Sequence, residues 1–377
     1  MDLEELSKKE LLEKCQELGI MKCKSKTKLE LIKTIKHLLQ LQNSEIEKQV
    51  TEIKLQEPQS ETDVKFKMID LFAGTGAFSY AFHQTNKVDT VFANDLLESS
   101  ESIFNLNNHI KLTRKDLNSI KDEEIPEFDI LTGGFPCQPF SIAGMKKGFE
   151  DERSNVFWKI LSILKTHSPK IVVLENVKNL QSHDNGNTYK VIVENLTNLG
   201  YHVKTKILNT CKITNVPQNR ERIYIACFKD KKMYDKFNFE FNEIENNSIV
   251  NFLEENIPEK YYYNDKTIIY DELKKNVVKP IETNTIYQYR RYYVRENKNG
   301  VCPTLTANMG GGGHNVPIIL DKKGIRKLTP RECFNLQGFH KDYKLPTLSD
   351  SKLYSLAGNA VSMPVVCLIA NRIAELL

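Results

Sequence analysis

A cysteine between two prolines is the residue of this sequence best placed for chemistry. Cys137 lies in residues 133–141, GGFPCQPFS, directly after a predicted strand ending in FDILT. Prolines make the loop rigid, and open α/β sheets place their sites at the carboxyl ends of strands. Structural cysteines usually lie inside strands or helices, as we expect for Cys227 and Cys367. We therefore interpret Cys137 as a reactive thiol; a purely structural cysteine is the alternative.

An acid and two arginines accompany this cysteine. Glu175 follows the apolar run KIVVL at the end of another predicted strand, at the same sheet edge as Cys137. Arg220 and Arg222 alternate in QNRER, just before the predicted strand RIYIACF, so their side chains point the same way. Such a pair could face an anion or clamp a planar base, or it could belong to a solvated face.

A glycine-containing turn precedes these residues. Residues 70–76, DLFAGTG, join a predicted strand to a helix, and glycines there let the backbone approach a ligand. The spacing is not GxGxxG, which disfavours a dinucleotide. Asp95 ends the next strand, where an acid can hold ribose hydroxyls, and Asp116 could accept from an adenine amino group. This pattern predicts a nucleoside-type cofactor without a pyrophosphate; an ordinary glycine turn is the alternative.

Strands that alternate with helices must position these side chains. The predicted strands are KFKMIDLF, VDTVFAN, FDILTGG, KIVVLEN, VKTKILNT and RIYIACF. This alternation predicts βαβ units and a mostly parallel sheet. Residues 229–324 break the rhythm and are predicted to be an inserted domain of short strands and loops. A helix–loop–helix pattern over residues 325–377 completes the chain.

The first 64 residues have a different character. Residues 1–40 predict a separate helical module, because leucines repeat at helical spacing in two segments. Residues 22–36 hold six lysines against one acid, Glu30. This region resembles a SAP-like motif, a small DNA-binding module, and the alternative is a helical hairpin with a solvated lysine face. Residues 41–64 are polar and predict a linker.

Composition excludes several classes of protein. The 377 residues are 40% hydrophobic and 27% charged, with a net charge of +4, which supports one or two ordinary globular cores. The eight cysteines are scattered without a CxxC pair, so no zinc site or other metal site is expected. The charged start, MDLEELSKKE, is unlike a secretory signal, and no apolar run of about 20 residues suggests a membrane span. We therefore expect a cytoplasmic protein.

Six motifs, in order, resemble those of the C5-cytosine DNA methyltransferases. They are DLFAGTG, GGFPCQPFS, ENV, QNRER, RKLTPRECFNLQGF and YSLAGNAVSMPV. The resemblance covers residues 66–377. It implies an α/β fold with the Rossmann-like sheet of methyltransferases that use S-adenosylmethionine (AdoMet) as cofactor. It implies a catalytic domain from residues 65–228 and 325–377, with residues 229–324 as a smaller target-recognition domain.

The resemblance also implies catalytic roles. Cys137 would attack C6 of a flipped cytosine, which activates C5 toward the methyl group of AdoMet. Glu175 would hold or protonate N3 of the base, and Arg222, with Arg220 nearby, would contact the base.

Further residues match the family's cofactor and DNA positions. The expected cofactor residues are Phe72, Gly74, Gly76, Asp95, Asp116, Pro136, Asn359 and Val361. Asp95 stands where the family more often has Glu, and Asn359 could instead be a helix N-cap. The residues expected to contact DNA are Gln138, Ser141, Arg290, Arg291, Arg295 and Thr304.

The predicted function is site-specific DNA (cytosine-5) methylation of double-stranded DNA. The chain would be the modification half of a restriction–modification system of bacterial, viral or phage origin. We expect a monomer, with a cognate restriction endonuclease as its functional partner. The alternatives are an RNA cytosine-5 methyltransferase of the same fold, a non-catalytic DNA-binding scaffold and a small-molecule methyltransferase. Intact Cys137, Glu175, Arg220 and Arg222 argue against the scaffold, and a small-molecule enzyme would not need Cys137.

Overall fold

The computed structural model separates into two compact units, Met1–Val64 and Lys65–Leu377. In the first unit, the helical residues Leu11 and Leu31 are fully buried, whereas Leu29, expected on the apolar face of the second helix, is 65% exposed. Most of the predicted module 1–40 and the whole linker 41–64 lie outside the described residues. The structure describes residues 7, 8, 11, 12, 27–32, 34, 65–136, 156–290, 292–297, 299–310 and 316–377.

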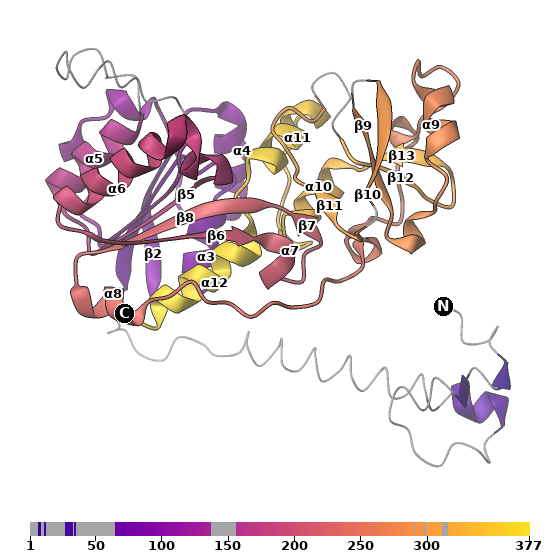
Figure 1. Ribbon diagram of the computed structural model, residues 1–377, viewed down its shortest axis with the longest axis horizontal. Helices are drawn as coiled ribbons and strands as arrows, with labels where there is room; N and C mark the ends of the chain where they lie inside the picture. Colours follow the sequence, from indigo (N-terminus) through magenta and orange to yellow (C-terminus); the bar gives the residue numbers. More distant parts are fainter. Residues whose placement is uncertain are drawn as a thin grey trace. The chain divides into compact units, whose positions relative to one another are not determined.

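A seven-stranded sheet forms the centre of the larger unit, in the order β3-β2-β1-β4-β5-β8-β6 (Figure 1). The first five strands in this order run parallel, and β8 runs antiparallel to both β5 and β6. The predicted strands are all present, and β3 is an addition too short to predict. The bounds are β1 Phe66–Leu71, β2 Val88–Asp95, β3 Thr113–Arg114, β4 Ile130–Gly134, β5 Ile171–Val177, β6 His202–Asn209 and β8 Glu221–Phe228.

Helices cover both faces of this sheet (Figure 1): α5 and α6 on one face, α3 and α12 on the other. Along β5, Val172 and Leu174 pack in the core beneath α5 and α6, while Ile171 and Val173 pack in the core beneath α3 and α12. Burial on both faces explains why the strands read as continuous apolar runs. The helices are α3 Ala77–His83, α4 Glu98–Asn107, α5 Val156–His167, α6 Asn187–Asn198, α7 Thr210–Ile213, α8 Lys231–Lys236, α9 Tyr270–Asn276, α10 Pro330–Leu336, α11 Asp350–Asn359 and α12 Met363–Ala374.

Short 3₁₀ turns fill several connections between these elements. They are η1 Leu117–Ser119, η2 Asp122–Glu124, η4 Lys178–Gln181, η5 His183–Gly186, η6 Ile249–Phe252, η7 Glu259–Tyr261 and η8 Ile281–Thr283. The turns η4 and η5 lead from β5 into α6, directly after the predicted catalytic Glu175. They contain Asp184 and Asn185 with left-handed backbone, at φ of 50° and 54°.

A smaller antiparallel sheet, in the order β10-β9-β12-β13, lies beside the large one. The strand β13 follows the predicted insert 229–324 in sequence. Phe237, near the start of that insert, packs on Phe228 of the central sheet, with ring centroids 5.0 Å apart. A parallel pair, β7 with β11, completes the strands. The bounds are β7 Gln218–Asn219, β9 Ile286–Arg290, β10 Tyr293–Asn297, β11 Cys302–Pro303, β12 Ile318–Leu320 and β13 Ile325–Lys327.

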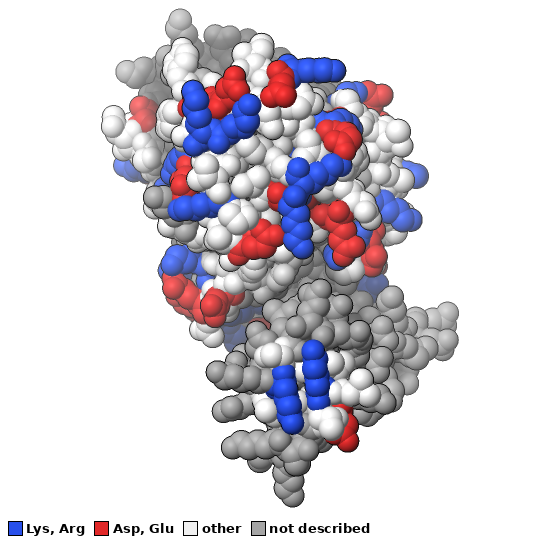
Figure 2. Space-filling view, turned by 90° about the vertical axis from the view of Figure 1, so that its right-hand side faces the viewer, with Lys and Arg blue, Asp and Glu red and all other residues white. Residues whose placement is uncertain are grey.

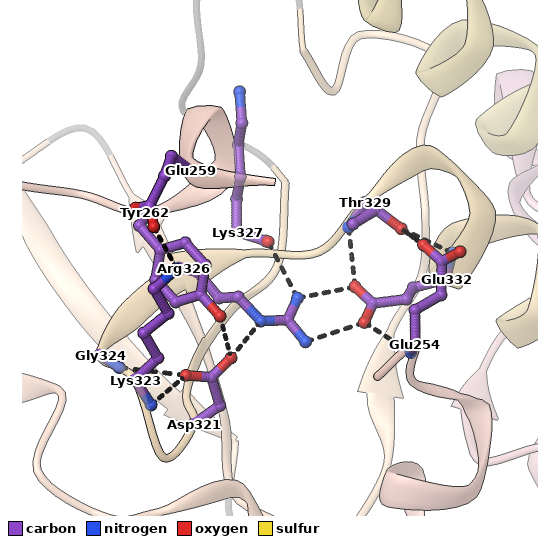
Figure 3. Close-up of polar contacts among 10 residues, drawn as sticks. All are labelled: Glu254, Glu259, Tyr262, Asp321, Lys323, Gly324, Arg326, Lys327, Thr329 and Glu332. Atoms are coloured by element: carbon purple, nitrogen blue, oxygen red, sulfur yellow. Dashed lines mark hydrogen bonds and ion pairs between the residues drawn. The ribbon is translucent and has the colours of Figure 1, made fainter. Parts of the chain in front are cut away.

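A buried ion network joins the smaller sheet to α10 (Figure 3). Arg326 of β13 is 1% exposed and donates two 2.8 Å hydrogen bonds to the carboxylate of Glu332 in α10. Asp321 accepts from Arg326 Nε, and Thr329 forms a capping box with Glu332. A bidentate pair with further partners fixes direction as well as distance. The network therefore sets the orientation of β13 relative to α10.

The last two helices are apolar. Residues Asp350–Ala374 are long and apolar enough, by length and composition, to cross a membrane, although no such run was expected from the sequence. However, α11 ends at Asn359, Ala360 has an extended backbone with ψ of 141°, and 67% of the apolar window is buried inside the protein. The stretch therefore forms two core helices of this fold.

Candidate active site

The carboxyl ends of the parallel strands open onto a cavity of about 430 Å³. Its walls come from the turn after β1, the ends of β2, β4 and β5, the segment from β7 into β8, and the end of α11. This is the edge at which open α/β sheets bind their ligands. The predicted residues that line the cavity are Phe72, Gly74, Asp95, Pro136, Glu175, Arg220, Arg222, Asn359 and Val361.

The turn after β1 aims an acid at the cavity. Phe72 and Gly74 both have left-handed backbone, with φ of 55° and 52°, so the chain turns sharply within FAGTG. The Gly74 N–H donates to Asp95 Oδ2, and the Leu97 N–H donates to Asp95 Oδ1, both at 2.9 Å. These bonds fix the carboxylate, and each oxygen keeps a lone pair for a ligand hydroxyl.

Two residues predicted for cofactor binding do not line the cavity. Asp116 is exposed and caps η1, where it accepts the Asn118 N–H at 3.0 Å. Gly76 has φ of 73°, and a Cβ there would lie 2.6 Å from Asn108 Nδ2 and 2.9 Å from Phe104 Cδ2. Packing against α4 therefore requires the glycine, whereas sequence reasoning had assigned it to the approach of a ligand.

Gly134 and the segment after α11 bring two walls of the cavity together. A Cβ on Gly134 would lie 3.3 Å from Val361 Cγ2 and 3.4 Å from Glu175 Oε2. The predicted cofactor side and the predicted catalytic side therefore meet across a residue without a side chain. No role was predicted for Gly134 from the sequence, although its place as the second glycine of GGFPC could have marked it. Asn359 is the last residue of α11, so the alternative of a helix N-cap is wrong.

Glu175 and Arg222 form a buried ion pair on neighbouring strands. Arg222 Nε lies 3.1 Å from Glu175 Oε1, and Glu175 is 7% exposed. The contact lacks hydrogen-bond geometry, which leaves Glu175 Oε1 without a hydrogen-bond partner. Burial raises the pKa of Glu175, and the charges of Arg222 and Arg220 oppose that rise. The carboxyl can therefore hold a proton more readily than an exposed glutamate and has an oxygen available for a ligand.

Arg220 lies at the cavity but is tied to backbone carbonyls. It is 2% exposed and donates to the carbonyls of Leu305 at 3.0 Å, Gly358 at 3.3 Å and Ala360 at 2.6 Å. Burial, with Arg222 nearby, lowers the pKa of Arg220 to about 9. This geometry makes it a positioning residue that joins the chain after β11 to the end of α11, whereas the sequence predicted contact with a base.

Asn176 is a positioning residue that sequence analysis left without a role. Its Nδ2 donates to the Phe135 carbonyl at 2.8 Å, and its Oδ1 accepts the Val177 N–H at 2.8 Å. These bonds tie the end of β5 to the loop that leaves β4. That loop leads through Pro136 directly to Cys137. The signal was present in the ENV motif, because a buried amide after an apolar strand must find partners.

A second cavity, of about 510 Å³, is lined in part by Asn219, whose neighbour in sequence, Arg220, lines the first. It brings together Arg290, Arg295 and Thr304, which were predicted to contact DNA, and adds Asn219 of β7. The Thr304 hydroxyl donates to the Asn219 carbonyl at 2.6 Å. The predicted residues Cys137, Gln138, Ser141 and Arg291 lie outside the described residues.

The whole larger unit is similar to known proteins. Residues 66–375 match the family described as C-5 cytosine-specific DNA methylase. The chain is 47% identical over 312 residues to the type II methyltransferase M.Bsp6I of Bacillus sp. strain RFL6, covering 81% of this chain and 98% of that protein. It is 34% identical over 316 residues to the type II methyltransferase M.HhaI of Haemophilus parahaemolyticus, covering 82% and 94%.

A solved structure supports the same fold. The Dnmt2 methyltransferase of S. pombe has a TM-score of 0.64 and 21% identity, covering 83% of this chain and 99% of that one. The parallel-dominated sheet and the smaller antiparallel sheet therefore recur in a distant methyltransferase. With its motifs gathered at one cavity and its sequence matched from residue 66 to residue 375, the chain belongs to the C-5 cytosine-specific DNA methylases.

Proposed function

We propose that this chain is a site-specific DNA (cytosine-5) methyltransferase that uses AdoMet and double-stranded DNA. The observation that carries the proposal is the meeting of Val361 and Glu175 across Gly134. A methyl donor held on the Val361 side and a base held on the Glu175 side would then be in reach of each other. Family membership supports the same reaction.

The cofactor side of the cavity fits AdoMet. Its volume of about 430 Å³ is in the range of small-molecule sites. Phe72 offers an aromatic face, Gly74 gives close approach, and the fixed carboxylate of Asp95 can accept ribose hydroxyls. Pro136, Asn359 and Val361 complete the wall, and Asp116, which does not line the cavity, is proposed from the family resemblance alone. When bound, AdoMet supplies an electrophilic methyl group.

The protein's own groups would activate the cytosine. The Cys137 thiolate forms a bond to C6, the π pair of the C5–C6 double bond shifts to a new C4–C5 double bond, and the π pair of the C4–N3 double bond takes a proton from Glu175 at N3. C5 thereby becomes nucleophilic. After C5 carries the methyl group, a base removes the C5 proton, the sulfur–C6 bond breaks, and the double bond returns. Glu175 recovers its proton from N3 in the same stage.

Arg222 would hold both Glu175 and the target cytosine. Its guanidinium lies beside Glu175 and lines the same cavity, so its remaining donors can reach a cytosine carbonyl. A cytosine can enter this cavity only when it is flipped out of the base stack of the duplex, at a cost of a few kcal/mol. Arg220 and Asn176 would support the reaction through the backbone segments that they hold.

The wider setting is also proposed. Residues 229–324 would act as the target-recognition domain and residues 1–40 as a SAP-like DNA-binding module joined by the linker 41–64. The enzyme would work as a monomer in a bacterial cytoplasm and protect DNA from a cognate restriction endonuclease. The type II class of its relatives supports this setting.

Methyl transfer from radiolabelled AdoMet tests the proposal. Purified protein is given plasmid DNA in one reaction and transfer RNA in another, with Cys137→Ser as the matched control. We expect label in DNA with the wild type and none with the variant. Label in RNA alone would establish the RNA alternative, and AdoMet binding without label in either would favour the scaffold.

A further inference from the structure

The hairpin formed by β9 and β10 has two different faces. The antiparallel register pairs Gln288 with Arg295 and Arg290 with Tyr293, so these four side chains lie on one face. Tyr287 and Val294, on the opposite face, pack in the apolar core of the smaller sheet. Beyond Ile286, which is buried in the core of the central sheet, the first face carries the polar side chains of Gln288, Arg290 and Arg295.

This polar face lines the cavity of about 510 Å³. The hairpin contributes Arg290 and Arg295, and Asn219 and Thr304 form part of the facing wall. Asn219 precedes Arg222 by three residues of nearly extended chain, which spans roughly 10 Å. Stacked base pairs are about 3.4 Å apart. A duplex whose cytosine reaches Arg222 would thus present its neighbouring base pairs, up to about the third, to this hairpin.

Arg290 is held in a defined orientation within the cavity. Its Nη2 donates to Gln288 Oε1 at 3.1 Å, and Gln288 is 4% exposed, so the support is itself packed. This bond occupies one edge of the guanidinium and leaves the other donors of the exposed Arg290 for a ligand.

The charge around the cavity favours an acceptor-rich partner. The acid at its rim, Glu296, is paired with Lys279 at 2.7 Å, so the charges of Arg290 and Arg295 are not cancelled there. The side of the larger unit that Figure 2 presents shows Lys and Arg interspersed with Asp and Glu. At the cavity, Arg290 and Arg295 are two cations suited to a base edge rich in acceptors.

We propose that Arg290, supported by Gln288, reads a guanine within three base pairs of the target cytosine. Guanine presents O6 and N7 as adjacent acceptors in the major groove, which match two donors of a planar guanidinium. Arg290 is the specificity-determining residue and Gln288 its positioning residue. The inference rests on the proposed DNA methyltransferase function and adds one base of the recognition sequence.

The test removes one acceptor at a time. Bisulfite sequencing of plasmid DNA treated with the wild type first gives the methylated context. Synthetic duplexes of that context then carry 7-deazaguanine, which lacks N7, at each single guanine within three pairs of the target. We expect one position at which the wild type loses about tenfold or more in kcat/KM. At that position Arg290→Gln should show no further loss, because the contact is already gone.

Matched variants separate this contact from a general loss of charge. Arg295→Gln removes the same charge from the same cavity and should keep the sensitivity to 7-deazaguanine. Gln288→Leu should weaken the sensitivity, and Gln288→Glu, which keeps an acceptor oxygen for Arg290, should restore it. A merely structural role of Gln288 would lower activity equally on every duplex.

The outcomes distinguish the inference from the function on which it rests. If the wild type methylates DNA but no guanine within three pairs is sensitive, the inference is overturned and the function stands. The same holds if Arg290→Gln remains as sensitive as the wild type. If the wild type transfers no methyl group to any DNA, the proposed function fails, and the inference fails with it.

Discussion

Glu175 is prepared for its proposed role by burial. Its carboxyl is nearly excluded from solvent, and Arg222 lies 3.1 Å away without a hydrogen bond. Burial raises the pKa of the carboxyl, while both nearby arginines pull it down. An acid balanced in this way can hold a proton and still release it to a bound base.

Glu175→Gln should reduce the single-turnover rate of methyl transfer by about a hundredfold or more, because an amide cannot supply the proton to N3. The substitution is nearly isosteric, so AdoMet affinity should stay within a few-fold of the wild type. Rapid-quench kinetics and isothermal titration calorimetry would measure the two quantities. A wild-type rate would remove Glu175 from the mechanism.

Asp70 makes the stability depend on pH. It is fully buried, and burial raises its pKa to about 6, although Ser79 and Thr132 donate to it. The folded state therefore binds a proton more tightly than the unfolded state, whose Asp has a pKa of about 3.9. Stability contributed by this group is present at low pH and is lost as pH rises from about 4 to about 6.

Asp70→Asn should remove this dependence. Asn keeps an oxygen for Ser79 and can donate to Thr132, whose hydroxyl also lies 3.3 Å from the Ile69 carbonyl. Urea unfolding at a series of pH values should show wild-type stability falling relative to the variant between pH 4 and 6. A constant difference across that range would mean that the pKa of Asp70 is not raised.

At the scale of elements, the short pair β7–β11 joins the smaller sheet to the cavity. Gln218 donates to the Leu336 carbonyl at 2.6 Å and accepts the Leu305 N–H at 3.2 Å, while Arg220 holds the same Leu305 through its carbonyl. A Cβ on Gly358 would lie 2.1 Å from the Thr306 carbonyl carbon, so the chain after β11 crosses α11 at its closest approach. Alternate residues of one motif thus play two parts: Arg220 holds the chain after β11, and Arg222 lines the cavity.

Arg220→Met and Arg222→Met should therefore fail in different ways. The first leaves three buried carbonyls without a donor, and each unsatisfied group costs about 1–3 kcal/mol, so the melting temperature should fall together with kcat/KM. The second removes a group at the cavity wall and should lower kcat with the melting temperature little changed. Differential scanning fluorimetry beside steady-state kinetics measures both. Equal melting temperatures would show that Arg220 does not stabilise the contact between the chain after β11 and the end of α11.

For the whole molecule, the central sheet was predictable strand by strand, whereas the smaller one was predictable only as an insert of short strands and loops. Strands such as β5 are buried on both faces, so the consecutive apolar residues Ile171–Leu174 already reveal them. In the smaller sheet, β12 and β13 have three residues each, and tertiary contacts rather than local pattern define them.

The candidate site shows the same division. Glu175 and Asp95 were found because an acid after an apolar strand is unexpected. The support given by Arg220 and the packing role of Gly76 depend on residues far away in sequence, Leu305 and Phe104, so no local pattern could reveal them.

Deletion of residues 1–64 should leave the larger unit folded, because Lys65–Leu377 is compact by itself. Methylation of a short duplex should persist, whereas binding to long DNA at low salt should weaken if the first unit binds phosphates. Activity on a short duplex and filter binding to plasmid DNA would test both points. Loss of folding would show that the first unit belongs to the core.

Bisulfite sequencing of a plasmid from cells that express this chain tests the central claim most directly. A parallel culture expresses Cys137→Ser, which keeps the fold and removes the nucleophile. We expect cytosines protected in one recurring sequence context with the wild type and none with the variant. Equal protection in both cultures would contradict the assignment of Cys137, and no protection by soluble, AdoMet-binding wild type would contradict DNA cytosine methylation itself.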